Sequence, residues 1–377
     1  MRKLRILVLI DYQCCFLSHT VLTGLWEMEN AEIYEMSILQ SVRGRADNGY
    51  DLPGNPGGGM TGCTGYLQPN PLPEQIHTEE EILDLGWGHF DLIVATSNRD
   101  YVRRALHTLN NKGYWNRDRI RERIVICDGE DTNWIDRDFL NTWKPRALFK
   151  REMTRDHSIP TYWSEYNLPV MPLQFGTFLR SLPKIDDEFK DRDFYVSLGR
   201  TNPIRDKFIS CALDAVYEKQ ICHPDNAWIA TNDNSPLVTE HRYGKELHNL
   251  SSWTDYMVRQ GRSKIGASLL GFGRDCLHSW ELFSFATLVL YQDTGLHIPH
   301  PFIDGRHCRY IREDEFPVLH HILQQFLEED EWRMAVAKAG RDWCHLHHST
   351  RARAEYLTEV AMKIIGGGKI DPEAHGL

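Results

Sequence analysis

Short runs of consecutive apolar residues recur along the whole chain, and many end in a polar or glycine-bearing turn. They cover residues 4–10, 91–96, 123–127 and 147–149 in the first half, and 194–198, 227–230, 264–270 and 287–291 in the second. Each run is almost continuously apolar, which is typical of strands that helices cover on both faces. We therefore interpret these runs as buried strands.

Helical segments are expected between the strands. They include 101–110, 203–220, 274–285 and 313–328. A final helical stretch over 329–365 is expected to break at 348–350 and to end at three consecutive glycines, 366–368. Strands that alternate with helices in both halves predict an α/β protein with two doubly wound parallel sheets.

The chain has 377 residues, and a single hydrophobic core seldom grows beyond about 250–300 residues. Residues 182–193 are polar and charged and include Pro183, as expected of a linker between domains. We predict a first domain over 1–185, a second domain over 190–350, and a C-terminal segment over 351–377 that forms a helix and a loose tail.

The composition is that of an ordinary folded protein, with 41% hydrophobic and 25% charged residues and a formal net charge of −10. An acidic surface does not favour loose binding to nucleic-acid backbones, although it permits a local basic cleft. No run approaches the roughly 18 apolar residues of a membrane span. The nine cysteines include no Cys-x-x-Cys pair, so we expect reduced thiols in a cytoplasmic protein.

A glycine-rich stretch between residues 47 and 73 interrupts the pattern. It lacks the Gly-x-x-x-x-Gly-Lys-Ser/Thr order of a P-loop, so we do not interpret it as an ATP site. Long loops without secondary structure are uncommon in compact domains unless they serve a function or are disordered. Two interpretations stay open, a mobile lid or acceptor loop and plain irregular structure.

Ligands of doubly wound sheets bind beyond the carboxyl ends of the strands, so residues that follow a strand are candidates for a site. Gly271 and Gly273 precede an expected helix, whose free N–H groups would attract an anion, and Arg274 adds a positive charge. Glu281 lies about 12 Å further along the helix, and a carboxylate accepts two hydroxyl hydrogen bonds, as a ribose diol requires. The alternative is a tight turn with Glu281 in a structural salt bridge.

A second strand end carries three positive charges. Arg200, Arg205 and Lys207 follow the run at 194–198, and Pro203 lies near the first turn of the next helix. Diphosphates require such donors, particularly where no metal ion neutralises them. If the site transfers a group from a nucleoside diphosphate, Arg200, Arg205 and Lys264 would stabilise the leaving diphosphate. The alternative is a solvent-exposed helix start.

Three acids follow the run at 123–127. Asp128, Glu130 and Asp131 could act as a general base, bind sugar hydroxyls or hold Mg²⁺. The alternative is a turn whose acids cap a helix. Lys150-Arg-Glu152 follows the next run and could pair with these acids.

The second half of the chain resembles the glycosyltransferase-like domain of the CgeB-type, or spore-maturation, proteins, which are related to the retaining group-1 glycosyltransferases with the GT-B fold. The stretches that carry the resemblance are 194–200, 263–266, 271–275 with Trp280 and Glu281, 301–305, 339–343 and 348–352. The first half of the chain resembles, more weakly, the N-terminal domain that accompanies this glycosyltransferase-like domain. The stretches that carry this weaker resemblance are 90–94, 128–131 and 149–152.

The resemblance implies two Rossmann-like domains that face each other across a cleft, and a C-terminal helix that crosses back to the first domain. The second domain would hold a nucleotide-sugar donor, with a UDP-sugar favoured, and the first would hold the acceptor. Glu281 matches the second acid of the family's Glu-x₇-Glu pair, which binds the ribose. Arg200 matches the arginine that meets the phosphates, and Lys207 resembles the lysine that follows it. Gly273 stands at the position of the first Glu, which leaves the donor sugar and the stereochemical outcome open.

We therefore expect a hexosyl- or pentosyltransferase that uses a nucleoside-diphosphate sugar and an acceptor hydroxyl, with no required cofactor and no bound metal. In an inverting enzyme Asp128, Glu130 or Asp131 would deprotonate the acceptor, with Asp11 and His77 as further candidates. In a retaining enzyme no such base is required, and the acids would bind the acceptor.

Other functions stay open at this point. One is a nucleotide-sugar epimerase or hydrolase on the same fold, and another is a non-catalytic module that binds nucleotide sugars. Sugar transfer onto modified bases of DNA is a special case of the first hypothesis. The net charge of −10 argues mildly against a nucleic-acid acceptor.

Overall fold

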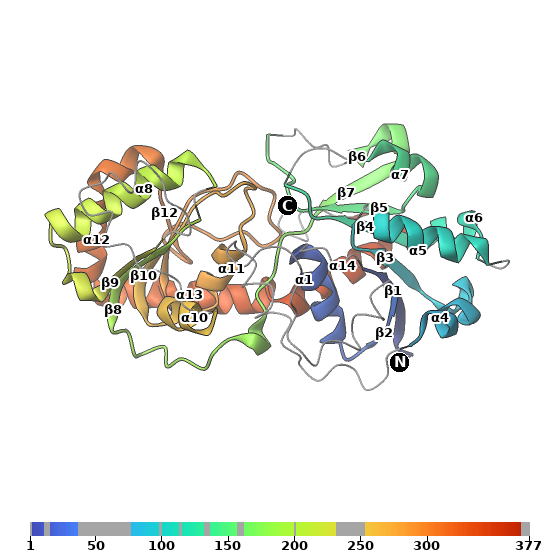
Figure 1. Cartoon of the computed structure of the whole chain (residues 1–377), viewed down its shortest axis with the longest axis horizontal. Helices are drawn as coiled ribbons and strands as arrows, with labels where there is room; N and C mark the ends of the chain where they lie inside the picture. Colours follow the sequence, from blue (N-terminus) through green and yellow to red (C-terminus); the bar gives the residue numbers. More distant parts are fainter. Residues whose placement is uncertain are drawn as a thin grey trace.

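The computed structural model describes residues 2–10, 16–36, 77–97, 100–112, 115–131, 136–156, 162–199, 201–230 and 253–370. The glycine-rich stretch at 47–73, Asp11 and Arg200 lie outside these residues. The described chain forms two α/β halves side by side, each built around its own sheet (Figure 1).

The first sheet has the strand order β2-β1-β3-β4-β5-β7-β6. All neighbouring strands are parallel except β6, which pairs antiparallel with β7 at one edge. The strands are β1 (Leu4–Leu9), β2 (Ala31–Met36), β3 (Leu92–Ala95), β4 (Ile124–Asp128), β5 (Ala147–Lys150), β6 (Tyr162–Trp163) and β7 (Leu168–Pro172).

The second sheet has the order β12-β11-β10-β8-β9, and its strands are parallel throughout. The strands are β8 (Arg192–Ser197), β9 (Ala227–Ala230), β10 (Ser263–Ser268), β11 (Leu288–Tyr291) and β12 (Arg309–Tyr310). The sequence-based prediction of an α/β protein with two doubly wound parallel sheets is confirmed.

The helices of the first half are α1 (Phe16–Trp26), α4 (Glu79–Leu85), α5 (Asp100–Asn111), α6 (Arg117–Arg121) and α7 (Arg137–Trp143). Those of the second half are α8 (Pro203–Leu213), α10 (Trp253–Gly261), α11 (Leu277–Phe283), α12 (Leu319–Glu328) and α13 (Asp330–His347). The last helix, α14 (Thr350–Ile365), belongs to the first half. Short 3₁₀ turns lie at Trp87–His89, Ser164–Tyr166, Leu179–Ser181, Pro224–Asn226 and Glu313–Val318, and a π turn, Asp214–Glu218, extends α8. Among the described helices, none combines the length and the hydrophobicity that crossing a bilayer requires.

The continuous apolar runs are explained by burial on both faces of the sheet. Successive side chains of a strand point to opposite faces. In β1, Ile6 and Val8 pack in the core that includes α1 and α14, whereas Leu7 and Leu9 pack in the core that includes α5. Because both faces lie against helices, the strands contain few polar residues.

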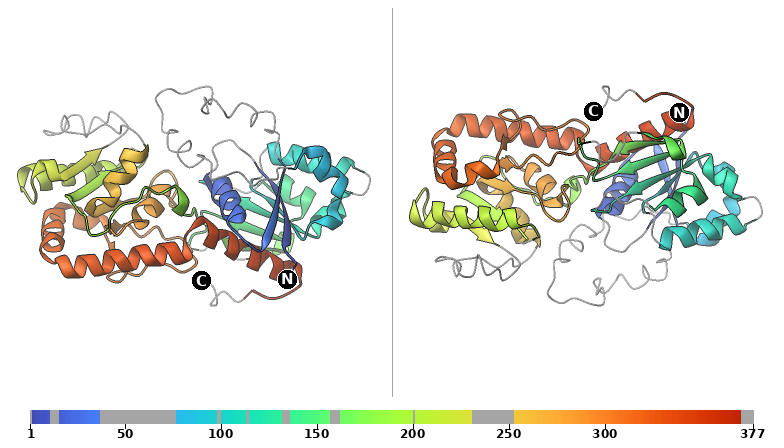
Figure 2. Two further views of the ribbon diagram at one scale, coloured as in Figure 1. Left: turned by 90° about the horizontal axis from the view of Figure 1, so that it is seen from below. Right: turned by 90° about the horizontal axis from the view of Figure 1, so that it is seen from above.

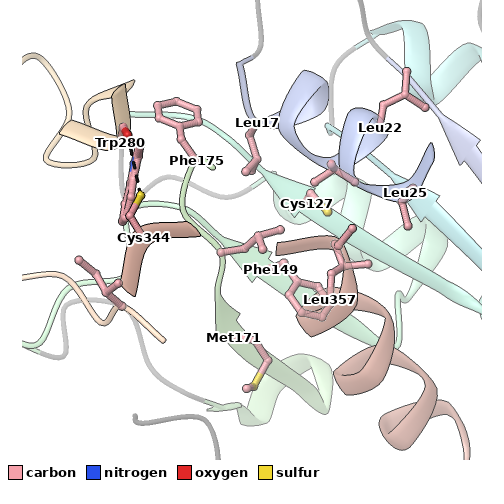
Figure 3. Close-up of a cluster of buried hydrophobic side chains, with 14 of the residues drawn as sticks. Leu17, Leu22, Leu25, Cys127, Phe149, Met171, Phe175, Trp280, Cys344 and Leu357 are labelled. Atoms are coloured by element: carbon pink, nitrogen blue, oxygen red, sulfur yellow. Dashed lines mark hydrogen bonds between the residues drawn. The ribbon is translucent and has the colours of Figure 1, made fainter. Parts of the chain in front are cut away.

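The core on the α14 side continues from the first half of the molecule into the second. Figure 3 shows Leu17, Phe149 and Leu357 of the first half in one cluster with Trp280 and Cys344 of the second, and Phe175 lies between the two groups. The two halves therefore share buried apolar surface.

The C-terminal helix returns to the first half, as predicted. Helix α13 lies with the second sheet, and α14 lies against the first (Figure 2). Ser349 caps α14, and the hydroxyl of Thr350, its first residue, donates to Glu27 over 2.7 Å. Gly24 of α1 faces the Thr350 carbonyl so closely that no Cβ atom fits between the two helices.

Gly24→Ala is expected to lower the free energy of unfolding by about 1–3 kcal/mol, because the added methyl group would force α1 and α14 apart. Denaturant unfolding followed by circular dichroism measures the effect. Gly88→Ala is the matched control, since a Cβ atom at Gly88 meets no atom within 4 Å. Equal stability of the Gly24 and Gly88 variants would contradict the close contact between α1 and α14.

Candidate functional site

The loops that follow the strands of the two sheets meet between the two halves of the molecule. The backbone N–H of Arg155, after β5, donates to the carbonyl of Gly295, after β11, over 2.8 Å. The N–H of His297 donates to the carbonyl of Met153, also over 2.8 Å. Ligands of doubly wound sheets bind at such strand ends, so a site here would draw on both domains.

The loop between β10 and α11 covers residues 269–276. The sequence predicted that a helix with free backbone N–H groups would begin within this loop, and the structure differs. Helix α11 begins only at Leu277. The N–H groups of Arg274 and Asp275 donate to the carboxylate of Glu152 from the first domain, over 2.9 and 3.0 Å. The Arg274 guanidinium donates to the carbonyl of Thr294 over 2.9 Å. A protein carboxylate therefore already occupies the donors that were expected to attract an anion.

The two glycines of this loop lie against side chains that leave no space for a Cβ atom. At Gly273 a Cβ atom would lie 2.5 Å from Oδ1 of Asp131 and 2.7 Å from Oε1 of Glu152. At Gly271 it would lie 2.9 Å from a guanidinium nitrogen of Arg205. Real Cβ atoms do not approach other atoms this closely. The position at which the resembling family has its first Glu is thus adjacent to two carboxylates of the first domain.

Arg205 connects the turn after β8 to the β10–α11 loop. Its guanidinium donates to the carbonyls of Gly199 over 2.7 Å, Leu269 over 2.8 Å and Leu270 over 2.6 Å. Arg205 is buried, and desolvation lowers its pKa. These bonds shape the turn that leads into Arg200, so the structure gives Arg205 a structural role beside the predicted contact with a diphosphate.

The two lysines of the predicted diphosphate site pair with acids. Lys207 is exposed on α8 and forms an ion pair with Glu313. Lys264 is the second residue of β10 and pairs with Asp193, the second residue of β8, over 2.7 Å. Lys264 thus lies near the amino end of its strand, about 13 Å from the carboxyl end at 3.3 Å per residue. This geometry does not support its predicted contact with a leaving diphosphate.

The three acids at the carboxyl end of β4 and just beyond it lie in different environments. Asp128 is buried and accepts from the fully buried amine of Lys150 over 2.9 Å, and from the N–H of Glu130 over 3.0 Å. Asp131 pairs with the buried Arg151, and its side chain is 51% exposed. The predicted pairing of these acids with the residues after β5 is confirmed. Asp131 therefore combines an ion pair that holds its carboxylate with access to solvent.

Asp275 is a residue to which the sequence analysis assigned no role. Its carboxylate is buried and accepts from the N–H of Phe175 over 2.8 Å and from the indole N–H of Trp280 over 2.7 Å. Burial raises the pKa of Asp275 to about 6, although the charge of Arg151 opposes the shift. The Arg353 guanidinium of α14 lies 5.0 Å above the Trp280 ring. Asp275 therefore connects a loop of the first domain to α11 of the second domain through its hydrogen bonds to Phe175 and Trp280.

Glu281 is buried on α11, and its only hydrogen-bond donor among the described residues is the hydroxyl of Tyr256, over 2.6 Å. The described residues place no cation in an ion pair with it, which does not support the structural salt bridge considered above. Burial raises the pKa of Glu281 to about 8. A buried carboxyl group without a cation is costly unless further donors reach it. This environment is one in which a ligand hydroxyl could supply them.

His77 lies away from the three acids. Its ring stacks on Tyr34 of β2, with ring centroids 4.3 Å apart. Strands β1 and β3 separate β2 from β4, the strand that ends at Asp128. The structure therefore does not bring His77 together with the acids, and Asp11 lies outside the described residues.

The structure holds no group of three or more His, Cys, Asp or Glu side chains arranged to bind a metal ion, as far as the described residues extend. The carboxylates of Asp128 and Asp131 pair with Lys150 and Arg151 instead. The described acids therefore do not form the Mg²⁺ site considered in the sequence analysis.

No family model and no curated protein matches the sequence. The fold matches solved structures over nearly the whole chain. A glycosyltransferase from Rickettsia africae is 8% identical with a TM-score of 0.60, over 97% of this chain and 99% of that one. HepE from Anabaena, in complex with UDP-glucose, is 10% identical with a TM-score of 0.55, over 94% and 98%. An alpha-glucosyltransferase in complex with UDP and a 13-mer DNA is 11% identical with a TM-score of 0.57, over 96% and 100%.

The chain has the GT-B fold of these two-domain glycosyltransferases. The predicted fold is confirmed at this level, and the specific relation to CgeB-type proteins stays a prediction. Identities this low establish the fold alone. A shared fold does not fix the activity, which depends on the residues of the site.

Asp128→Asn is expected to cost about 3–5 kcal/mol of stability, because it leaves the buried Lys150 amine without its counter-charge. Chemical denaturation measures the loss. Asp131→Asn is the matched control and should change stability by less than about 1 kcal/mol, since the Asp131 carboxylate is exposed and Arg151 keeps Glu152 as a counter-charge at 3.2 Å. An Asp128 variant that keeps its stability and loses turnover would identify Asp128 as a catalytic base instead.

Glu281→Gln is expected to remove part of the pH dependence of stability. In the folded protein Glu281 keeps its proton up to about pH 8, whereas the unfolded chain releases it at the ordinary value of 4.5. The native state therefore binds more protons between these values, and stability falls as the pH rises from 4.5 to 8. The variant cannot ionise, so its stability should exceed that of the wild type by a few kcal/mol more at pH 8.5 than at pH 4.5, at about 1.4 kcal/mol per pKa unit.

Urea unfolding at the two pH values measures this difference. Glu355→Gln, which removes an exposed acid paired with Arg351, is the control. Parallel pH profiles for the wild type and the Glu281 variant would show that the Glu281 carboxyl group is not desolvated.

Proposed function

We propose that this protein is a glycosyltransferase that moves a hexosyl or pentosyl group from a nucleoside-diphosphate sugar to an acceptor hydroxyl, without a bound metal ion. A UDP-sugar is the preferred donor. The reaction takes place where the loops after β4 and β5 meet the loops after β8 and β10. The second domain binds the nucleotide, and the first domain provides groups for the acceptor.

The observation that carries the proposal is the environment of Glu281. Its carboxyl group is buried on α11, the helix that follows β10, with one neutral donor and no cation among the described residues. A vicinal diol such as that of a ribose supplies two hydroxyl donors to one carboxylate. A residue whose pKa is strongly shifted by burial, on a fold that binds ligands at these strand ends, is a good candidate for ligand binding.

The turn after β8 supports a diphosphate site beside Glu281. Arg205 holds this turn against the β10–α11 loop through the carbonyls of Gly199 and Leu270. Arg200 follows Gly199 directly in the sequence. Guanidinium groups stabilise the charge that develops on a departing diphosphate. We assign Arg200 the diphosphate contact and Arg205 the shaping of the turn.

Asp131 is the acid that we assign to the acceptor. Its side chain is half exposed, and the buried guanidinium of Arg151 holds it beside Gly273. In an inverting reaction it would take the proton of the acceptor hydroxyl. In a retaining reaction it would bind that hydroxyl. Asp128 has no such role in this proposal, because Lys150 and the Glu130 N–H already engage its carboxylate.

The similar structures support the choice of donor. HepE binds UDP-glucose, and the alpha-glucosyltransferase binds UDP. UDP and UDP-glucose are therefore the first ligands to test.

UDP is expected to bind to the protein at pH 7 with release of a proton. The Glu281 carboxyl group is mostly protonated at this pH, because its pKa is about 8. Hydroxyl groups that donate to the carboxylate favour its ionised form and lower this pKa. Calorimetric titration in phosphate and in Tris, two buffers that differ in ionisation enthalpy, measures the released proton. Binding should persist in EDTA.

Glu281→Gln is the matched variant for this titration. It should bind UDP about tenfold or more weakly, as expected from the loss of hydrogen bonds to a charged group, and without buffer dependence. If UDP, UDP-glucose and other nucleoside-diphosphate sugars all fail to bind the wild type, the proposed function is wrong. Equal affinity of the wild type and the variant would instead remove Glu281 from the nucleotide site.

A further inference from the structure

The β10–α11 loop is held from two sides by groups of opposite charge. On one side the Arg205 guanidinium of the second domain donates to the carbonyls of Leu269 and Leu270. On the other side the Glu152 carboxylate of the first domain accepts from the N–H groups of Arg274 and Asp275. The backbone conformation of the loop is therefore fixed jointly by a cation from its own domain and an anion from the other.

Glu152 is engaged on both of its oxygens. Oε1 accepts from the Asp275 N–H over 3.0 Å and lies 3.2 Å from a guanidinium nitrogen of Arg151, and Oε2 accepts from the Arg274 N–H over 2.9 Å. The residue is 3% exposed. Arg151 itself donates to the carbonyl of Asp275 over 2.7 Å. Hydrogen bonds of this kind, between backbone N–H groups and a buried carboxylate, are among the strong ones in proteins.

The fit of Glu152 to the loop depends on glycine at position 273. A Cβ atom there would lie 2.7 Å from Glu152 Oε1 and 2.5 Å from Asp131 Oδ1. Any side chain at this position would push the two carboxylates away from the loop. The glycine therefore serves the contact between the domains.

We propose that Glu152 is a positioning residue, which fixes the β10–α11 loop of the second domain in the conformation that binds the nucleotide sugar. This inference rests on the proposed function. It means that the donor site is complete only while the first domain is in contact with the second. Through this loop the first domain also controls the start of α11, the helix that carries Glu281.

If Glu152 instead competed with the ligand, its removal would have the opposite effect on binding. If the phosphates of the donor took over the N–H groups of Arg274 and Asp275, Glu152 would compete with the ligand. Removing its charge would then tighten binding. For a positioning residue the same change weakens binding, so the sign of the effect decides between the two.

The test is calorimetric titration of the full-length protein with UDP and with UDP-glucose. Glu152→Gln keeps the size of the side chain and weakens its acceptor strength, and Gly273→Ala displaces the carboxylate without removing it. Both variants should bind UDP-glucose about tenfold or more weakly, as expected from the loss of a charge-assisted hydrogen bond. Glu188→Gln, which removes an exposed acid paired with Lys338, and Gly88→Ala are the matched controls. Circular dichroism shows whether each variant is folded.

The outcomes separate the two proposals. Absence of UDP and UDP-glucose binding in the wild type counts against the proposed function itself. Binding by the wild type, with unchanged or tighter binding by folded Glu152→Gln and Gly273→Ala, overturns the positioning role alone. A role in stability only would lower the melting temperature of the variants and leave their affinity unchanged, which also overturns it.

A measurement on the wild type keeps the inference testable if both variants fail to fold. The amides of Arg274 and Asp275 should exchange their hydrogens slowly in the ligand-free protein, since both donate to a buried carboxylate. Saturating UDP-glucose should leave them at least as well protected. Faster exchange of these two amides in the presence of UDP-glucose would overturn the proposal, because it would show that the ligand releases them from Glu152.

Discussion

Arg151 and Glu152 meet the β10–α11 loop between the two domains, and the geometry of the whole site depends on this contact. Glu152 accepts two backbone N–H groups of the second domain, and Arg151 donates to the Asp275 carbonyl. In the opposite direction, the Asp275 carboxylate of the second domain accepts a hydrogen bond from the N–H of Phe175 in the first domain. Donors and acceptors thus cross the boundary in both directions, which fixes the orientation of one strand-end loop against the other.

The charged groups buried where the two domains meet are tolerated because they have partners. An unpaired charge in the interior costs several kcal/mol, whereas a paired and hydrogen-bonded charge costs much less. Asp128 has Lys150, Arg151 has Asp131, and Arg205 has three carbonyls. Most charges in this region therefore have a structural explanation, and a predicted catalytic role for any of them requires additional support.

Glu281 is different, and the proposed function depends on that difference. Within the described residues it has one neutral donor, and burial alone accounts for its raised pKa. The cost of keeping it there is explained if a ligand completes its hydrogen bonding. Asp131 shows the complementary property, since it is charge-paired yet open to solvent. The proposed nucleotide site thus contains the buried Glu281, and the proposed acceptor site contains the exposed Asp131.

The continuous apolar runs of the sequence by themselves determined the strands, because burial on both faces of a sheet removes polar residues. The strands missed are those that lack this pattern. Strand β2 includes Glu32 and Glu35, and β7 contains Pro169 and Pro172, residues that argue against a strand unless it lies near a sheet edge. The sequence also indicated the pairing of the acids after β4 with the bases after β5, since neighbouring parallel strands bring Asp128 and Lys150 into register.

Only the tertiary structure decided which of the candidate residues act together. Glu152 and Gly273 are far apart in the sequence. No local pattern therefore shows that the position of the Glu152 carboxylate requires a glycine at position 273. The same holds for Arg205, which donates to backbone carbonyl groups. Every residue has such a group, so the side-chain sequence does not indicate which ones Arg205 contacts. Local pattern determines which segments are buried, because hydrophobic burial acts residue by residue along each element. The contacts of buried charges depend on where distant loops meet, and that is a property of the folded chain.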